Sequence, residues 1–255
     1  MRIASWNVNS IKARLEHVLS YCQNTSNDVL LLQELKTTDE NFPRVSFQNI
    51  GWHVASHGQK TYNGVAIVSK KKIEVTQVGL PGDETDEQAR YIEAQVEGIR
   101  LASIYLPNGN PFPGPKFEYK LEWMSRLYNR AKKLYFDEIP VVLGGDFNII
   151  PQPIDCFDPS AWEQDALFRK ESREKFYEIC NLGYLDALRQ INPYGTHYTF
   201  WDYQRGAWQK DDGIRIDHLL LSPEAANKLL DCQVDRKPRG LERPSDHTPI
   251  WCDLS

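Results

Sequence analysis

The 255-residue sequence lacks the composition of a disordered or membrane-spanning chain, because 41% hydrophobic and 25% charged residues are ordinary proportions for a globular protein. It is also poor in cysteine. The cysteines stand singly, with no pair at the short spacing of a zinc site or a redox motif. We therefore expect reduced thiols in packing roles, at Cys22, Cys156, Cys180, Cys232 and Cys252.

Other features that the sequence lacks limit where the protein is expected to act and which reactions it is expected to catalyse. No basic leader with an apolar segment opens the chain, which starts with the strand-like Ile3–Val8, so we expect a cytoplasmic protein, nucleoid-associated in a prokaryote. No glycine-rich nucleotide loop with its lysine is present, which leaves kinase or NTPase chemistry unsupported. Without a Pro/Gly/Ser linker, a composition break or a repeat, residues 1–255 are predicted to form one domain.

Short apolar runs separated by turn-rich joints predict a strand-rich fold. Helical spacing begins near Ile11 with Ser10 as a candidate cap, and Leu106–Pro115 must be a loop because it is rich in proline. Strands are predicted at 3–8, 28–34, 52–56, 64–69, 73–78, 91–96, 101–106, 139–145, 198–201, 214–221, 232–236 and 249–254. Helices are predicted at about 11–22, 117–135, 172–182 and 223–230.

This order of elements predicts an α+β fold: a four-layer α/β/β/α sandwich of two packed, mainly antiparallel sheets with helices on the outer faces. A doubly wound parallel sheet fits poorly. The strands between 64 and 106 follow one another through joints that are too short for helical crossovers.

One polar segment, Leu143–Ile149, directly follows the apolar run Val141–Leu143. Side chains alternate across a strand, so Asp146 and Asn148 would project to one side while Phe147 packs on the other. Two glycines before Asp146 would let this strand end lie close to its neighbours. The alternative is an ordinary turn, since Asp and Asn both favour turns.

Other predicted strand ends carry similar side chains: Asn7, Asn9, Glu34, Asp217, Asp246 and His247. Each has a structural alternative. Asn9 could belong to a helix cap, Asp217 could pair with Arg215, and Asp246 could cap a turn. Their recurrence at strand ends favours a single pocket.

The oxygen-rich set around Glu34 suits Mg²⁺, with Mn²⁺ as a substitute, whereas zinc would require cysteine or histidine clusters. A metal-bearing carboxylate pocket with a His–Asp pair is equipped to hydrolyse a phosphodiester. The metal neutralises developing charge, a base activates water, and donors stabilise the transition state.

Six segments resemble, in order along the whole chain, the exonuclease III family of abasic-site endonucleases. They are Trp6-Asn7-Val8-Asn9, Leu32-Gln33-Glu34-Leu35-Lys36, Tyr105-Leu106-Pro107-Asn108-Gly109, Gly144-Gly145-Asp146-Phe147-Asn148, Arg215-Ile216-Asp217 and Ser245-Asp246-His247-Thr248-Pro249. The Glu, Gly-Asp-x-Asn and Ser-Asp-His motifs are shared with the wider superfamily of DNase I, sphingomyelinases and inositol polyphosphate 5-phosphatases. The forms around Glu34 and Tyr105 are narrower and favour the DNA-repair branch.

The resemblance implies a DNase I-like fold and a role for each matching residue. By this resemblance Glu34 would bind the metal, with Asn7 beside it and Asp246 on the metal side. The catalytic residues would be Asp146 for water, Asn148 and Tyr105 for phosphate, and His247, paired with Asp217, for the scissile phosphate. Either Asp146 or the Asp217–His247 pair could accept the proton, and we favour Asp146. Some relatives carry Asp where this chain has Asn9, so a second tightly held cation is not expected.

DNA contacts are expected at the active rim although the net charge is −5, because local charge governs a site more than the total does. Arg90 matches a family position that contacts the DNA backbone, and Lys116 and Lys120 are further candidates. In the family, the loop at 199–210 helps to form the pocket for a flipped abasic sugar. Phe200 and Trp201 would form its wall, although one of the two is expected to belong to the core, and Trp208 is a candidate wedge.

These observations predict a Mg²⁺-dependent nuclease that cuts double-stranded DNA 5′ to abasic sites and removes nucleotides or blocking groups from 3′ ends. We expect a monomer that binds no membrane. Two alternatives stay open. One is a phosphodiesterase of the same superfamily acting on lipid or inositol phosphates, and the other is a catalytically silent nucleic-acid-binding module. The complete set of Glu34, Asp146, Asn148, Asp217 and His247 counts against the silent module.

Overall fold

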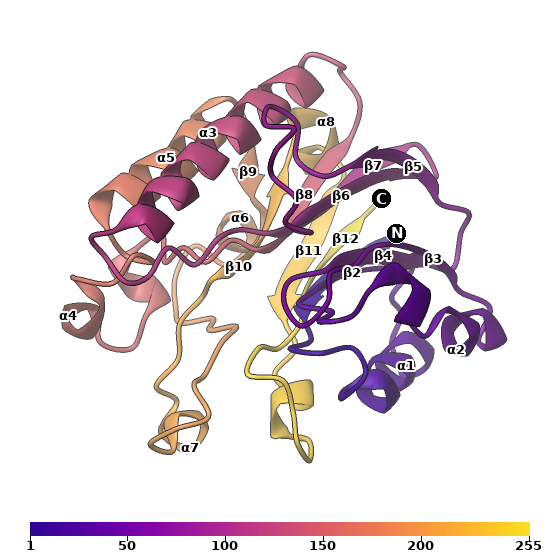
Figure 1. The fold of residues 1–255 in the computed structure, drawn as a ribbon, viewed down its shortest axis with the longest axis horizontal. Coiled ribbons are helices and arrows are strands. Elements are labelled where there is room, and N and C mark those ends of the chain that lie inside the picture. Colours follow the sequence, from indigo (N-terminus) through magenta and orange to yellow (C-terminus); the bar gives the residue numbers. More distant parts are fainter.

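The computed structural model describes residues 1–255 and contains two six-stranded sheets packed face to face (Figure 1). The first sheet has the order β11-β12-β1-β2-β4-β3. Its strands are β1 (Arg2–Asn7), β2 (Val29–Gln33), β3 (His53–His57), β4 (Val65–Ser69), β11 (Leu229–Val234) and β12 (Ile250–Leu254). The second sheet has the order β5-β6-β7-β8-β10-β9. Its strands are β5 (Glu74–Val78), β6 (Tyr91–Val96), β7 (Ile99–Tyr105), β8 (Val141–Asp146), β9 (Leu185–Asp186) and β10 (Asp217–Leu221).

Helices cover both outer faces (Figure 1). The first sheet packs against α1 (Leu15–Asn24) and α2 (Arg44–Asn49), and the second against α3 (Pro115–Tyr135) and α5 (Lys170–Asn181). The shorter helices are α4 (Pro159–Trp162), α6 (Ala187–Ile191), α7 (Ala207–Lys210) and α8 (Pro223–Ala226), with 3₁₀ turns η1 (Asp39–Asn41), η2 (Pro153–Asp155) and η3 (Lys237–Gly240). None of the helices combines the length and the apolar character needed to cross a bilayer.

The predicted sandwich is confirmed. Only β1–β2 and β7–β8 pair in parallel, and every other pair is antiparallel. Between the sheets lie apolar side chains such as Leu31, Leu101 and Leu219, all fully buried. Burying each such leucine contributes about 1.5–3 kcal/mol relative to leaving it in water. This core fixes the two sheets against each other and so fixes the strand ends that form the site.

Several predicted boundaries are wrong. Residues 198–201 form no strand but only isolated bridges, because Phe200 pairs with Ile214 and with His247 inside a loop. The predicted helix at 223–230 ends at Ala226, and Leu229 begins β11. Ser10 does not cap α1: the cap position is Arg14, without a side-chain cap hydrogen bond. The loop after Leu106 is confirmed, with α3 starting at Pro115.

Loops that carry α7 and η3 project from one edge of the sandwich (Figure 1). They are tied to the loop after β1. The Arg14 guanidinium donates to the Tyr203 hydroxyl (3.1 Å) and to the Pro244 carbonyl (3.0 Å), and the Tyr203 hydroxyl also donates to Pro244 (2.9 Å). Three segments far apart in the sequence therefore form one rim.

Candidate active site

Strand register brings three polar side chains abreast at one edge of the second sheet. Asp146, at the end of β8, is paired with Tyr105 on the parallel strand β7 and with Asp217 on the antiparallel strand β10. Asp146 and Asp217 are buried. Because β8 is central, its last residue is held from both sides.

The two glycines before Asp146 are required by close packing. A Cβ on Gly144 would lie 2.6 Å from Leu31 Cδ1 of the facing sheet, and one on Gly145 would lie 1.9 Å from the Ile104 carbonyl oxygen. Any side chain at either position would displace backbone or core atoms. The prediction that small residues let this strand end lie close to its neighbours is confirmed.

Asn7 connects the two sheets at the site. Its Nδ2 donates to Glu34 Oε1 and to Asp146 Oδ2, each at 2.9 Å, while its Oδ1 accepts from the backbone N–H of Asn9 at 3.0 Å. Its nitrogen therefore faces the carboxylates. This arrangement orients Glu34 and Asp146, and the side-chain oxygen that metal binding by Asn7 would need is turned toward Asn9.

Glu34 follows β2 in a left-handed backbone conformation (φ +53°), which turns its carboxylate away from the strand direction. Its Oε2 lies 2.9 Å from the Lys36 ammonium, which also donates to Asn9 Oδ1. Burial opposes the ionised form, but the hydrogen bond from Asn7 and the charge of Lys36 lower the pKa of Glu34 below its ordinary value. Glu34 is thus an anion in the folded protein.

The imidazole of His247 lies between two carboxylates. Its Nδ1 is 2.8 Å from Asp217 Oδ2, and its Nε2 is 3.7 Å from Asp146 Oδ2. Burial alone would lower the pKa of His247, but the charges of Asp217 and Asp146 outweigh it and raise the pKa to about 10. His247 is therefore an imidazolium. Asp217 pairs with His247 and not with Arg215, whose guanidinium binds Asp155 and Asp186.

The protonation of Asp146 is set by opposing effects. Burial raises the pKa of Asp146, and the negative charge of Asp217 adds to this effect, while the positive charge of His247 opposes it. The net result is a pKa of about 7. A carboxyl whose pKa is near neutrality is suited to exchange a proton with water.

The donor set fits a hard divalent cation. Ligand atoms of Glu34, Asp146 and His247 all lie within 4.8 Å of one another. The Nδ1 atom of His247 already lies 2.8 Å from Asp217, and the two carboxylates of the set, Glu34 and Asp146, suit a Mg²⁺ ion that retains several waters. Asp246 lines the same cavity, but its Oδ1 accepts from Asn9 Nδ2 at 3.1 Å.

A cavity of about 200 Å³ collects most of the predicted residues: Glu34, Tyr105, Asp146, Asn148, Asp246 and His247. Asn7 and Asp217 are fully buried and bond to its walls from behind. Burial and the carboxylates of Glu34 and Asp146 hold the pKa of Tyr105 well above its ordinary value, so its hydroxyl remains a donor.

Asn148 reaches this cavity by a turn and not by strand alternation, because β8 ends at Asp146 and Asn148 is left-handed (φ +49°). Its backbone N–H donates to Asp146 Oδ1 (2.9 Å), and its Nδ2 donates to the Leu106 carbonyl (2.9 Å). The Asn108 amide donates to Asn148 Oδ1 (3.2 Å). Sequence reasoning missed Asn108 as a lining residue, although it belongs to the Tyr-x-Pro-Asn-Gly segment.

The profile of the family described as "Endonuclease/Exonuclease/phosphatase family" matches residues 4–247. The chain belongs to this family. The exodeoxyribonuclease III of Haemophilus influenzae is 31% identical over 266 residues, covering 100% of both chains.

Two solved structures extend the comparison. The 3′ phosphatase NExo from Neisseria, bound to a product DNA hairpin, is 41% identical with a TM-score of 0.97, covering 100% of this chain and 99% of that one. An AP endonuclease from Archaeoglobus fulgidus is 38% identical with a TM-score of 0.96 and the same coverage. The chain is therefore a hydrolase of the exonuclease III/AP endonuclease group with the DNase I-like sandwich. A silent binding module is set aside, and the DNA branch of the family is favoured over the lipid and inositol phosphate branch.

The residues predicted to contact DNA differ in how exposed they are and in which groups they already contact. Arg90 donates to Gln88 (2.7 Å) and to the Tyr105 carbonyl (3.2 Å), and its guanidinium lies 4.8 Å from the centre of the Tyr105 ring. Lys116 is exposed in the first turn of α3. The prediction for Lys120 is wrong: it is fully buried and donates to the carbonyls of Asn148 (2.6 Å) and Asn108 (3.0 Å).

Among the predicted aromatic residues, only Phe200 lines the cavity, with its ring 5.0 Å from that of His247. Trp201 is fully buried, donates to Asp211 (3.0 Å) and so cannot form a pocket wall. Trp208 packs edge-on against Trp201 at 4.8 Å, with Arg236 and Arg239 over its ring, and is not a free wedge.

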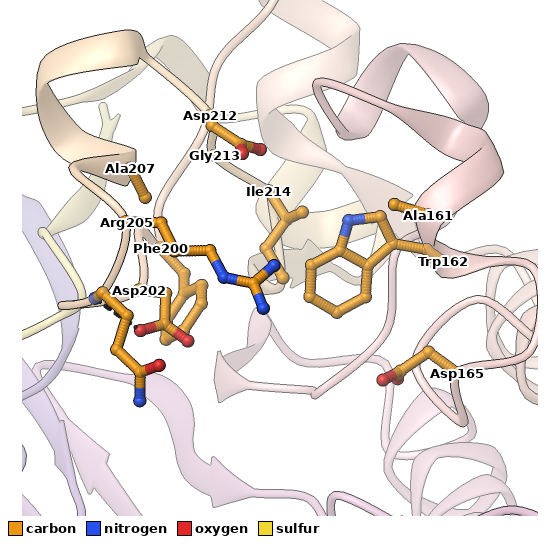
Figure 2. Close-up of a pocket in the computed structure, with 11 residues that line it drawn as sticks. Ala161, Trp162, Asp165, Phe200, Asp202, Arg205, Ala207, Asp212, Gly213 and Ile214 are labelled. Carbon is orange, nitrogen blue, oxygen red and sulfur yellow. Dashed lines mark hydrogen bonds between the residues drawn. The ribbon is translucent and has the colours of Figure 1, made fainter.

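Two further pockets adjoin the catalytic cavity. One of about 380 Å³ shares Trp162 and Phe200 with it, and another of about 450 Å³ shares Glu34 and Tyr105 and includes Lys36 and Arg90. Trp162 and Arg205 line the first pocket (Figure 2); sequence reasoning missed Trp162 and covered Arg205 only as part of the 199–210 loop. The signal available in the sequence was that a tryptophan, Trp162, occurs shortly after the Asn148 motif.

Proposed function

We propose that the protein is a Mg²⁺-dependent DNA repair nuclease that hydrolyses the phosphodiester 5′ to abasic sites in double-stranded DNA and also removes nucleotides and blocking groups from 3′ ends. The observation that carries this proposal is the His247 imidazolium between Asp217 and Asp146, in the cavity that Glu34 also lines. An anion-binding cation, a carboxyl with a near-neutral pKa and a cation-binding carboxylate are the groups that phosphodiester hydrolysis requires.

Each residue then has a task. Asp146 holds and deprotonates the attacking water, and His247 donates Nε2–H to an oxygen of the scissile phosphate, where negative charge develops. Asp217 keeps His247 protonated. The hydroxyl of Tyr105 and the amide of Asn148 donate to the remaining phosphate oxygens. A Mg²⁺ ion held by Glu34 beside Asp146 would neutralise charge on the phosphate and the leaving oxygen, and Mn²⁺ would substitute.

The electrostatics favour Asp146 as the base. A protonated His247 has no free lone pair with which to accept a proton from water. Asn7 supports the same assignment, because it directs an N–H at Asp146 Oδ2 and leaves the carboxylate aimed into the cavity.

The DNA would run along the rim. The pocket that contains Lys36 and Arg90 supplies positive charge for backbone phosphates on one side, and Lys116 adds another cation on α3. The DNA-hairpin-bound Neisseria structure and the exodeoxyribonuclease III relative support DNA as the substrate. We further propose that residues 1–255 act as one domain and as a monomer.

A duplex with a single abasic analogue tests this proposal. Incubation with Mg²⁺ should nick the strand 5′ to the analogue, and EDTA should stop the reaction. Metal-independent nicking would remove Mg²⁺ from the mechanism, and the absence of nicking would defeat the abasic-site assignment. A second duplex with a 3′-phosphate end separates the activities, because release of that phosphate without abasic nicking would restrict the function to 3′ ends.

A further inference from the structure

The last residue of β2, Gln33, is a buried glutamine to which the proposed reaction gives no task. Its side chain lies on the face of β2 that packs against the second sheet, because it is two residues after Leu31 of the core between the sheets. A fully buried amide costs free energy unless its hydrogen-bonding atoms have partners. The partners of this amide therefore show what Gln33 contributes.

Hydrogen bonds from the Gln33 amide cross the space between the two sheets. Its Nε2 donates to Ser5 Oγ on β1 (3.2 Å) and to Ser103 Oγ on β7 (3.0 Å), and its Oε1 accepts from the Ser5 hydroxyl (3.3 Å). The Ser103 hydroxyl in turn donates to the Leu32 carbonyl of β2 (2.9 Å). Both serines are fully buried. One side chain thus joins three strands from two sheets, through directional contacts that define their relative position more sharply than apolar packing does.

The catalytic cavity itself is divided between the two sheets. Glu34 follows β2 of the first sheet, whereas Tyr105 and Asp146 end β7 and β8 of the second. The two carboxylates of the cation site therefore belong to different sheets, and their separation depends on how the sheets are placed relative to each other. A misplacement of about 1 Å in an active site can cost about 100-fold in rate.

The amide bridge lies directly below this cavity. Gln33 immediately precedes Glu34, and Ser103 is two residues before Tyr105 on the same face of β7. Tyr105 is paired with Asp146 on the neighbouring strand. The bridge is therefore attached to each sheet within two residues of a group that lines the cavity.

We infer that Gln33 is a positioning residue, whose amide sets the distance between the Glu34 carboxylate on one sheet and the Asp146 carboxylate on the other and so tunes the affinity of the site for a divalent cation. The inference rests on the proposed function. Asn7 bonds to the same two carboxylates directly, while Gln33 fixes the strands that carry them. Stability alone does not require this amide, because an apolar core without orphaned polar groups can be as stable as a hydrogen-bonded one.

Binding of Mn²⁺ in the absence of DNA tests this role independently of cleavage. Electron paramagnetic resonance counts the free ion while the protein is titrated. Gln33→Met keeps an unbranched side chain without the amide and should weaken Mn²⁺ binding by about ten-fold or more, since residues that orient metal ligands typically change affinity by about 10–100-fold when replaced. Ser103→Ala removes only the contact with the second sheet. This milder variant should weaken binding by a smaller factor, and it provides the test if Gln33→Met does not fold.

A triple variant separates positioning from stability. Gln33→Met leaves the buried hydroxyls of Ser5 and Ser103 without their amide partner, which destabilises the fold. Adding Ser5→Ala and Ser103→Ala removes these groups, so the melting temperature should recover toward the wild-type value while Mn²⁺ binding stays weak. Ser222→Ala is the matched control, because it removes a buried hydroxyl that accepts from the Val141 N–H at the opposite end of β8. It should lower the melting temperature and leave Mn²⁺ affinity unchanged.

Three results would overturn the positioning role: unchanged Mn²⁺ binding in Gln33→Met, binding that recovers with the melting temperature in the triple variant, or an equal loss of binding in Ser222→Ala. A wild-type protein that binds no Mn²⁺ would overturn it together with the metal assignment. Adding Mg²⁺ and the abasic duplex tests the proposed function separately. A Mn²⁺ affinity that depends on Gln33, in a protein that does not nick the duplex, would count against the nuclease assignment and leave the positioning role standing.

Discussion

The Nδ1 atom of His247 lies 2.8 Å from Asp217 Oδ2, and this contact joins the segment before β12 to the first residue of β10. The other oxygen of Asp217 is buried without a hydrogen-bond partner. A buried carboxylate with one unmet oxygen depends on the cation beside it, so the charges of Asp217 and His247 stabilise each other.

Asp217→Asn should therefore lower the pKa of His247 and reduce kcat by about 10²–10⁴-fold, the size typical of losing a positioned proton donor. Two measurements check this: an NMR titration of the His247 imidazole and single-turnover cleavage of the abasic duplex. His247→Ala should cause a similar loss with DNA binding retained. A near-normal rate in either variant would remove the pair from the mechanism.

Asp146→Asn should abolish cleavage while preserving the fold, because an amide keeps the size of the side chain but cannot take a proton from water. Circular dichroism and thermal unfolding provide the control for folding, and affinity for the uncut duplex shows whether the substrate still binds. If Asp146→Asn retains substantial activity, Asp146 only aims the water and the base is another group.

Glu34→Gln should raise the Mg²⁺ concentration needed for half-maximal cleavage by at least about ten-fold, since a neutral amide replaces a carboxylate in a set that depends on hard anionic oxygens. The rate is measured across a Mg²⁺ titration on the abasic duplex. The same Mg²⁺ titration on Lys36→Met provides a comparison, because this variant removes the cation that pairs with Glu34 and keeps the Glu34 carboxylate. An unchanged Mg²⁺ dependence in Glu34→Gln would place the ion elsewhere.

The sequence was sufficient to predict which residues at the strand ends form the catalytic site, but not which residues form the surface around it. Asp146, Glu34 and His247 could be grouped because buried strands end at one edge of a sandwich and polar side chains recur there. Lys120 looks like a surface group in a linear sequence, yet it is fully buried on α3, at helical spacing from Phe117 and Met124. Trp201 is the member of the Phe200–Trp201 pair that lies in the core, as one of the two was expected to. Its charge hid the place of Lys120 on the buried face of α3, whereas the burial of Trp201 depends on the path of a loop, which no periodicity encodes. The same holds for Trp162, whose position relative to Phe200 is set by tertiary packing.

Trp208→Ala should lower the melting temperature and weaken binding of abasic and intact duplexes to similar extents. The indole packs against Trp201 and supports Arg236 and Arg239, so its loss disturbs the whole 199–213 loop. Parallel affinity measurements on the two duplexes decide the point. A selective loss for the abasic duplex would restore the wedge role that the sequence predicted.

His218 should make stability fall in mild acid. Its Nε2–H donates to the Ile149 carbonyl (2.9 Å), and its Nδ1 accepts from the Arg215 guanidinium (3.1 Å), so the buried ring is neutral. Burial, aided by the charge of Arg215, lowers the pKa of His218 to about 4. The unfolded chain takes up this proton near the ordinary histidine pKa of about 6.5, whereas the folded protein does not.

The stability that His218 contributes is therefore fully present above pH 6.5 and is lost as the pH falls toward 4, at about 1.4 kcal/mol per pH unit and about 3 kcal/mol in total. His218→Gln removes the titrating group, so its free energy of unfolding should depend less steeply on pH across this window, although the variant is less stable at pH 7. Urea unfolding at intervals between pH 4 and pH 7 measures both slopes. Equal slopes would show that His218 takes up its proton in the folded protein and that the acid sensitivity has another source.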